Sequence, residues 1–444
     1  MGKLKEFFIL NCMLPVSDMA FHTDIAKWYK VIKRMYKQPA SAIMDWQNAK
    51  LQVLIKVAYE HSPYYHELFD SVGVKPEDVK TFADLEKLPP LTKETLRARF
   101  DDIKLTNISE YHSKLCSTGG STGNPTRYIK DNVSWGFDNA FNILMWKQTG
   151  YHYGDKFLAL GSSSIFPVNK KSRFHEWYYR IKGKVPFNAM NLSEDRLSEC
   201  VELLKKKRIH YIYGYASSIF LLAKYVKQHN LGPALGIKAC FPTSEILTDL
   251  YRSTIKDAFG CVISDTYGAH DGGIVAHSLG DGFKVSYNCI VEIDKNSRRP
   301  DGSGVAMLTD VTNLAFPFIR YELGDELVLG GGYDDSYNGQ VLERVIGRTS
   351  DVIELENGRV LTGPGFTILF SQLKITGYRL YKSGPMEITV EVVKDSNYSK
   401  KDDELLVGTM KKHAGDDCEI KVVYADKVKH RENGKNLYFL NERV

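Results

Sequence analysis

The chain has 444 residues, of which 43% are hydrophobic and 25% are charged, and its formal net charge is +5. This composition excludes a disordered or fibrous protein, and the length exceeds what one ordinary core supports, so we expect a globular protein of more than one domain. The densest basic cluster, at residues 205–208, follows an apolar helical pattern and indicates a solvated helix end. We therefore expect no nucleic-acid partner, while a mild positive balance suits a protein that handles nucleotides.

The seven cysteines are scattered, odd in number and never spaced CxxC. This pattern favours reduced thiols in a cytoplasmic protein over a disulfide framework or a zinc site. The apolar segment 7–14 (FFILNCML) is short and lacks a cleavage pattern, and no window reaches the length of a membrane span. We predict no transmembrane segment, and a peripheral N-terminal helix remains open.

Residues 1–110 have the pattern of a helical start. Apolar residues recur at intervals of three and four along residues 51–59, Pro63 stands where a new helix begins, and Thr92 precedes another helix as its cap.

The segment 117–126 (STGGSTGNPT) then places three glycines among four hydroxyl residues. Glycines let successive N–H groups converge on an anion, and hydroxyls add rotatable donors. No lysine follows the last glycine, so this is not the GxxxxGK[ST] loop. The alternative is an ordinary surface turn.

From residue 111 onward, strand-like and helix-like runs alternate. The expected strands are 156–161, 208–215, 237–245 and 262–269, and the expected helices are 193–208, 217–230 and 247–260. This alternation predicts a parallel α/β architecture with ligands at the carboxyl ends of strands. After residue 283 strands and turns dominate, and the last 90 or so residues read as a small α+β lobe with strands at 388–393 and 419–425.

Five further segments follow in order: PTSEIL with Glu245, DTYGAHDGG with Tyr267, IRYELGDE with Asp325, IGRTSDVI with Arg348, and HRENGKNLYF with Lys435. Each alone has an ordinary structural reading, such as a core aromatic or a Gly-Asp turn. Their joint order after the Ser/Thr/Gly loop is the informative feature.

In this order the segments resemble the adenylate-forming superfamily of acyl-CoA synthetases, and most closely its phenylacetate–coenzyme A ligase branch with the CapK-like proteins of capsular-polysaccharide biosynthesis. Segments 57–69 and 88–97 support the likeness, which covers nearly the whole chain. The resemblance implies an α/β fold with a large N-terminal domain, 1–350, and a small mobile α+β domain, 351–444, hinged at Asp351. It implies an enzyme that joins a carboxylate to the α-phosphate of ATP, releases pyrophosphate, and passes the acyl group to a thiol, such as that of coenzyme A, or to an amine.

The resemblance also assigns roles to residues. Tyr267 and Gly268 would lie against the adenine, Asp325 would accept from the ribose hydroxyls, and Arg348 would pair with ribose or phosphate. Lys435 would bridge the carboxylate and the α-phosphate as the mobile catalytic cation. The loop residues expected at the phosphates, with Thr122 also catalytic, are Ser117, Thr118, Gly119, Gly120, Ser121, Thr122 and Gly123.

One position departs from the family pattern. Asp271 stands where relatives carry a glutamate that helps to hold Mg²⁺, so the ion would shift, use a water, or lean on Glu245. The cysteines that bind zinc in some relatives are not evident, so we expect no zinc. The substrate class is a small-molecule or sugar carboxylate, and the aromatic-rich segments 173–181 and 211–220 would line its pocket.

Two other readings remain open. A catalytically degenerate nucleotide-binding protein could serve in a polysaccharide assembly, which Asp271 favours and Lys435 disfavours. A kinase-like phosphotransferase could use the glycine loop, but the loop lacks the lysine.

Overall fold

The computed structural model describes residues 2–117, 126–161, 179–189, 192–269, 273–278, 280, 282–335, 338–346, 352–362, 369–370, 373–426 and 439–440. Its contacts divide the chain into two compact units. Unit 1 comprises the described residues of Met1–Ser117, Thr126–Tyr153 and Thr266–Gly347, and unit 2 those of Gly154–Asp265 and Arg348–Val444.

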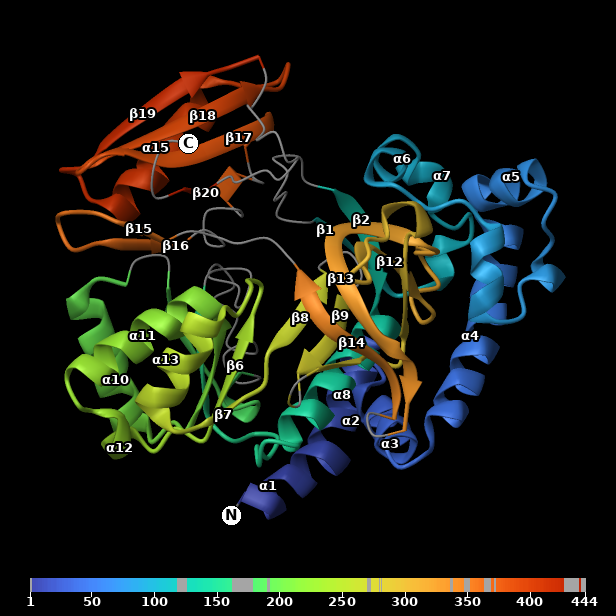
Figure 1. Ribbon diagram of the computed structural model, residues 1–444, viewed down its shortest axis with the longest axis horizontal. Helices are drawn as coiled ribbons and strands as arrows, with labels where there is room; N and C mark the ends of the chain where they lie inside the picture. Colours follow the sequence, from blue (N-terminus) through green and yellow to red (C-terminus); the bar gives the residue numbers. More distant parts are fainter. Residues whose placement is uncertain are drawn as a thin grey trace. The chain divides into compact units, whose positions relative to one another are not determined.

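Unit 1 begins with the helices drawn in blue in Figure 1. They are α1 (Gly2–Phe8), the π-helix η1 (Ile9–Met13), α2 (Leu14–Phe21), α3 (Ile25–Met35), α4 (Ala40–His61), α5 (Pro63–Ser71), α6 (Lys93–Ala98) and α7 (Phe100–Ile103), with the later α8 (Asn132–Lys147). Short 3-10 turns lie at Pro76–Asp78, Phe82–Lys87, Ile108–Glu110 and Lys295–Ser297. The predicted caps are confirmed: Pro63 is at the first turn of α5, and the Thr92 side chain accepts from the Thr95 N–H at 3.1 Å.

The strands of unit 1 form an antiparallel array. Their order is β11-β12-β13-β14-β10-β9-β8. The bounds are β8 (Thr266–Ala269), β9 (Gly273–Ser278), β10 (Phe283–Val285), β11 (Cys289–Ile293), β12 (Ser303–Asp310), β13 (Tyr321–Asp334) and β14 (Gly339–Ile346). A separate hairpin pairs β1 (Ser113–Ser117) with β2 (Arg127–Asp131).

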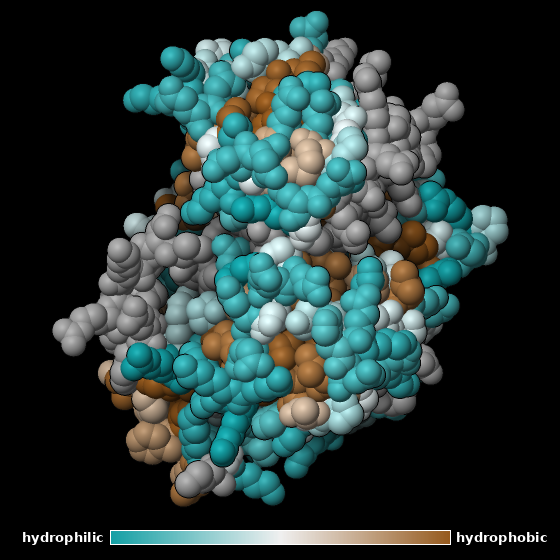
Figure 2. Space-filling view, turned by 90° about the vertical axis from the view of Figure 1, so that its left-hand side faces the viewer, coloured by the Kyte–Doolittle hydropathy of each residue, from teal (hydrophilic) through white to brown (hydrophobic). Residues whose placement is uncertain are grey.

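A single apolar cluster joins the helices of unit 1 to this sheet. It takes α4 through Leu51 and Leu54, α5 through Phe69, and the sheet through Val275 and Leu308, all fully buried. On the face shown in Figure 2, hydrophilic residues cover most of the surface and hydrophobic ones show in small separate areas. Burial of this apolar area is the main force that holds the α-helical start against the sheet.

Unit 2 contains the predicted parallel sheet. The strands β3 (Phe157–Gly161), β4 (Lys184–Asn188), β5 (Tyr211–Tyr215), β6 (Ala239–Thr243) and β7 (Val262–Ile263) pair in the order β4-β3-β5-β6-β7, and all pairs are parallel. The connecting helices, green in Figure 1, are α10 (Glu194–Lys207), α11 (Ala216–Gln228), α12 (Gly232–Leu235) and α13 (Asp249–Phe259). Continuous apolar runs make β3 and β6 fully buried strands, as parallel sheets require.

The C-terminal part is α+β, as predicted. Strand β17 (Ile375–Gly384) pairs with β18 (Glu387–Lys394), and β19 (Glu419–Tyr424) and β20 (Phe439–Leu440) flank them. Helix α15 (Lys400–Ala414) packs on this sheet through Leu406 and Met410, and a small ladder joins β15 (Val352–Glu354) to β16 (Val360–Thr362). The fold class is thus confirmed: a parallel α/β sheet, a β-rich part and a small α+β C-terminal part.

One strand expectation needs correction. The segment 262–269 is not one strand but β7 and β8, because β7 pairs parallel with β6 whereas β8 pairs antiparallel with β9. The segment after residue 283 contains the expected strands and turns, with β10 and β11 separated by a turn at residues 286–288. Within the described ranges, no helix is both long and apolar enough to cross a membrane.

Candidate nucleotide site

The Ser/Thr/Gly loop connects the two strands of a hairpin. Ser117, at the end of β1, pairs with Arg127 at the start of β2, and Thr118, Gly119, Gly120, Ser121, Thr122 and Gly123 lie outside the described residues. Thr126, which ends the segment, is buried, and its Oγ1 accepts from Arg97 Nε at 3.2 Å. Both ends of the loop are therefore held by strand pairing.

The structure brings together two of the predicted site residues. Tyr267 lies on β8 and Asp325 on β13, and they are 58 residues apart in the chain. The Tyr267 hydroxyl donates to Asp325 Oδ2 at 3.0 Å. Both side chains are only partly buried, so the pair presents a carboxylate oxygen and an aromatic face at one place in unit 1.

A β-bulge positions Asp325. The ladder between β12 and β13 passes from Val305↔Glu326 to Met307↔Glu322, so residues 323–325 stand opposite Ala306 alone. Within the bulge Gly324 has φ 76°, which glycine adopts without the strain other residues meet. Such bulges bend a strand and re-aim its side chains, which explains why a Gly-Asp pair is needed here.

A similar irregularity follows Tyr267. The register between β8 and β9 shifts between Tyr267 and Gly268, and Gly268 is exposed. Gly268 thus directly follows Tyr267 and lies two residues before the segment 270–272, which includes Asp271 and is outside the described residues.

One N-terminal segment, residues 88–97, holds the start of the strand that carries Asp325. Leu91 forms a parallel bridge with Tyr321, and its N–H donates to the Arg320 carbonyl at 3.1 Å. Lys93 Nζ donates to the carbonyl of Leu323, the residue before the bulge glycine, at 2.5 Å. Sequence reasoning noted segment 88–97 only as part of the likeness; the structure shows that it fixes the start of β13.

Tyr65 supports the same region from α5. Its hydroxyl donates to the Pro317 carbonyl at 3.0 Å and accepts from the Ile319 N–H at 3.2 Å, and its side chain is fully buried. Burial raises the pKa of Tyr65, so it stays a neutral donor and acceptor.

Glu245 lies two residues beyond β6 in unit 2. Ser244 before it has φ 68°, a left-handed backbone that turns the chain sharply at the strand end. Glu245 Oε2 accepts from the Ser217 N–H, in the first turn of α11, at 2.8 Å, and the buried Oε1 has no hydrogen-bond partner among the described residues. Burial raises the pKa of Glu245 to about 7, although the hydrogen bonds from Ser217 oppose this.

A buried ionic cluster lies beside the loop hairpin, and sequence reasoning missed it. Lys130 of β2 places Nζ 3.1 Å from Asp138 Oδ2 on α8 and 2.9 Å from Asp310 Oδ2 at the end of β12. Asn288 Nδ2 donates to Asp138 Oδ1 at 3.0 Å. Burial raises the pKa of Asp138 to about 7, while Lys130 and Asn288 lower it, and the two carboxylates raise the pKa of Lys130 despite its burial.

Gly273 ties the second glycine-rich segment to this cluster. It directly follows residues 270–272, its φ is 83°, and a Cβ at this position would lie 2.3 Å from Asp138 Oδ2. The cluster therefore anchors both β2, which follows the Ser/Thr/Gly loop, and β9, which follows the Asp271 segment. No local sequence signal marks this, because the residues are isolated polar positions far apart in the chain.

Several predicted residues lie outside the described residues: Arg348, Asp351, Asp271 and Lys435. Their roles stay predictions. In the part of the chain that the structure describes, no group of three or more His, Cys, Asp or Glu side chains could hold a metal ion. Of the two predicted Mg²⁺ ligands, Glu245 has a described position and Asp271 does not.

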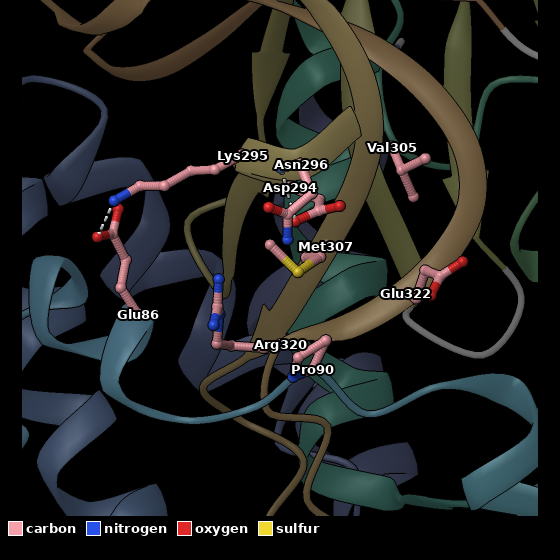
Figure 3. Close-up of a pocket in the computed structure, with 9 residues that line it drawn as sticks. All are labelled: Glu86, Pro90, Asp294, Lys295, Asn296, Val305, Met307, Arg320 and Glu322. Carbon is pink, nitrogen blue, oxygen red and sulfur yellow. Dashed lines mark hydrogen bonds and ion pairs between the residues drawn. The ribbon is translucent and has the colours of Figure 1, made fainter. Parts of the chain in front are cut away.

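A polar surface pocket of about 360 Å³ also lies in unit 1 (Figure 3). Glu86 and Lys295 form an ion pair at one side, and Arg320 lies between this pair and Pro90. None of the predicted site residues lines it, so this pocket is not the predicted nucleotide site.

Comparison with known proteins places these features in a family context. No family model matches the chain. Protein CapK of Staphylococcus aureus is 23% identical over 358 residues, covering 79% of this chain and 78% of that protein. The phenylacetate–coenzyme A ligase of Escherichia coli is 25% identical over 323 residues, covering 69% and 71%.

Among solved structures, 2-hydroxyisobutyryl-CoA ligase in complex with 2-HIB-AMP and CoA matches with a TM-score of 0.60 and 17% identity, over 92% of each chain. At this identity the likeness shows a common fold. In sequence, the chain is similar to CapK and to the phenylacetate–coenzyme A ligases, and in fold it is similar to 2-hydroxyisobutyryl-CoA ligase, so the comparisons support the resemblance to the adenylate-forming ligases.

Proposed function

We propose that this protein activates a carboxylate with ATP, forms an acyl-adenylate with release of pyrophosphate, and transfers the acyl group to a thiol or an amine. The observation that carries the proposal is the contact between Tyr267 and Asp325, two residues that the family pattern assigns to adenine and ribose. Among the relatives, the phenylacetate–coenzyme A ligases carry out a reaction of this kind by name.

The described residues fit a nucleoside. Asp325 is acceptor-only when ionised, and its partly buried carboxylate, whose Oδ2 accepts from Tyr267, has the chemistry to accept from a ribose hydroxyl. The ring of Tyr267 offers an apolar face for the adenine. In unit 2, Glu245 Oε1 has no hydrogen-bond partner among the described residues, and the resemblance assigns Glu245 to the nucleotide. These side chains bind and orient; they move no proton in the adenylation step.

The phosphates and the attack itself fall to residues known from sequence alone. In this proposal the hydroxyls of Thr118, Ser121 and Thr122 hold the β- and γ-phosphates, Arg348 pairs with ribose or phosphate, and Lys435 brings the carboxylate to the α-phosphate. Such transfers depend on positioning and electrostatic stabilisation more than on covalent help from the protein. Mg²⁺, held by Asp271 with Glu245 or a water, would neutralise phosphate charge.

The substrate is a small-molecule or sugar carboxylate, and the acceptor is coenzyme A, a carrier thiol or an amine. The resemblance to the CapK-like branch of capsular-polysaccharide biosynthesis supports a proposed role in such a pathway, in which the product would be an amide. The scattered, unpaired cysteines favour a cytoplasmic location. Similarity to the phenylacetate–coenzyme A ligases favours a thioester.

The test uses ATP labelled on the α-phosphate with a panel of aryl, aliphatic and uronic acids, with hydroxylamine as a general trap for acyl-adenylates. We expect labelled AMP and pyrophosphate that depend on one class of acid. Adding coenzyme A or an amino sugar in place of hydroxylamine identifies the acceptor.

Two variants and one control link the activity to the described site. Asp325→Asn should weaken ATP binding by about 1–3 kcal/mol, because a ribose hydroxyl loses its charged acceptor. Tyr267→Phe should also weaken ATP binding, because it removes the hydroxyl that donates to Asp325. Asp45→Asn, at an exposed position on α4, should match the wild type. Labelled ADP instead of AMP would support a phosphotransferase, and ATP binding without turnover for any acid would support a degenerate nucleotide-binding protein.

A further inference from the structure

The outward face of the N-terminal helical segment is apolar. Residues 2–21 are helical throughout, as α1, η1 and α2. Five large hydrophobic side chains on it are exposed: Leu4 (78%), Phe7 (64%), Phe8 (55%), Val16 (68%) and Met19 (79%). An exposed apolar area on the order of 700 Å² follows, above the few hundred Å² usual for a monomer's largest patch.

The inward face of the same segment is fixed by ionic contacts. Glu6 Oε2 accepts from Lys147 Nζ at 2.6 Å and lies 3.0 Å from His152 Nδ1, and Glu6 is 5% exposed. Asp18 accepts from the Thr23 hydroxyl and the Ala26 N–H, both at 2.6 Å. The inward face therefore buries two carboxylates together with Ile9, Leu10 and Leu14, and these contacts hold the segment with its phenylalanines outward.

The π-helix η1 aligns the two halves of the apolar face. On a regular α-helix, at about 100° per residue, Val16 would point about 120° away from Leu4. A π turn holds one extra residue and so rotates everything after it back by about 100°. With η1 at Ile9–Met13, the five exposed side chains fall within an arc of about 100°.

The charges around this face are positive. Lys3 and Lys5 lie one on each side of the apolar arc, and the only carboxylates of the segment, Glu6 and Asp18, are buried. The first 37 residues hold seven Lys or Arg and three Asp or Glu, a balance of +4 within a chain of net +5. Exposed basic residues continue along α3 and just after it, at Lys27, Lys30, Lys33, Arg34 and Lys37.

We propose that this face docks on an anionic lipid bilayer as an interfacial helix, with Phe7 and Phe8 at the acyl boundary and Lys3 and Lys5 at the headgroups. Helices that lie in the membrane surface combine an apolar face with flanking lysines whose stems extend toward the headgroups. A second copy of the chain fits less well. A symmetric pair would bring the flanking lysines of both copies together, and these like charges would repel one another.

The experiment is vesicle flotation of the full chain at low and at physiological salt. Vesicles of phosphatidylglycerol and phosphatidylcholine are compared with phosphatidylcholine alone. We expect binding to the anionic vesicles that weakens with salt. The Phe7→Ser/Phe8→Ser variant should lose at least about tenfold in partition coefficient, since two phenylalanines no longer enter the bilayer. Lys3→Glu/Lys5→Glu should lose anionic selectivity.

The matched control is Leu250→Ser/Val262→Ser, which removes two exposed apolar side chains of unit 2 and should bind as the wild type does. Val16→Ser/Met19→Ser tests the second half of the face if the phenylalanine variant fails to fold. No flotation of the wild type, equal flotation with neutral vesicles, or equal loss in the control would overturn the proposal. A dimer in sedimentation that the phenylalanine variant abolishes, without flotation, would assign the face to a second copy instead.

Discussion

Removing the ammonium of Lys130 should destabilise unit 1 strongly. In Lys130→Met the two carboxylates of Asp138 and Asp310 lose the cation that lies 3.1 and 2.9 Å away. Asp310 keeps donors from Thr312, its N–H at 2.9 Å and its hydroxyl at 2.8 Å. Among the described residues, Asp138 keeps one hydrogen-bond donor, the Asn288 side-chain amide, whose Nδ2 lies 3.0 Å from Asp138 Oδ1. Breaking a buried pair costs about 3–5 kcal/mol, so we expect about 4 kcal/mol lost at pH 8.

The pH dependence separates this cause from a simple loss of packing. Lys130 lowers the pKa of Asp138, so its removal raises that pKa further above 7. A carboxyl group whose folded pKa is raised contributes stability at low pH that is lost as pH rises through the folded pKa. The loss of stability in the variant should therefore be smaller at pH 6 than at pH 8, by about 1 kcal/mol.

The assay is urea unfolding followed by tryptophan fluorescence, which reports mainly unit 1 because four of the five tryptophans lie there. The control is Lys227→Met, which breaks an exposed ion pair with Asp257 at 2.8 Å and should cost less than about 1 kcal/mol. A cost for Lys130→Met below about 1 kcal/mol, or one that grows toward pH 6, would refute the reasoning.

Three further predictions concern the site. Lys435→Ala should abolish AMP formation while ATP still binds, because a contact made only in the transition state is lost; pyrophosphate exchange at the wild-type rate would remove Lys435 from the mechanism. Gly324→Ala should weaken ATP binding measured by calorimetry, since φ 76° strains alanine by about 1–2 kcal/mol and moves Asp325, whereas Gly408→Ala, in open space on α15, should not. Glu245→Gln should make the free energy of unfolding vary less between pH 5 and 8. The wild type loses stability as pH rises through the Glu245 pKa of about 7, because the carboxyl group then ionises in a buried site; an equal pH dependence in both proteins would contradict this.

The alternation of strands and helices in unit 2 could be predicted because its signals are local. Continuous apolar runs indicate buried parallel strands, and Thr248 before α13 caps the helix through the Tyr251 N–H at 3.2 Å. The division of 262–278 into β7, β8 and β9 could not be predicted, because strand breaks there depend on which neighbour each residue pairs with. The pairing is a long-range choice that periodicity does not contain.

The candidate site shows the same division. The sequence by itself predicted the kind of chemistry, because residues such as the tyrosine of YGA and the aspartate of LGD carry the resemblance wherever they lie in the fold. Only the tertiary structure decided that Tyr267 donates to Asp325, that Gly324 lies in a bulge of β13 against β12, and that Lys130, Asp138 and Gly273 share one buried cluster. Isolated polar residues have no periodicity, and their meaning comes from the low dielectric around them and from partners that folding brings within about 3 Å.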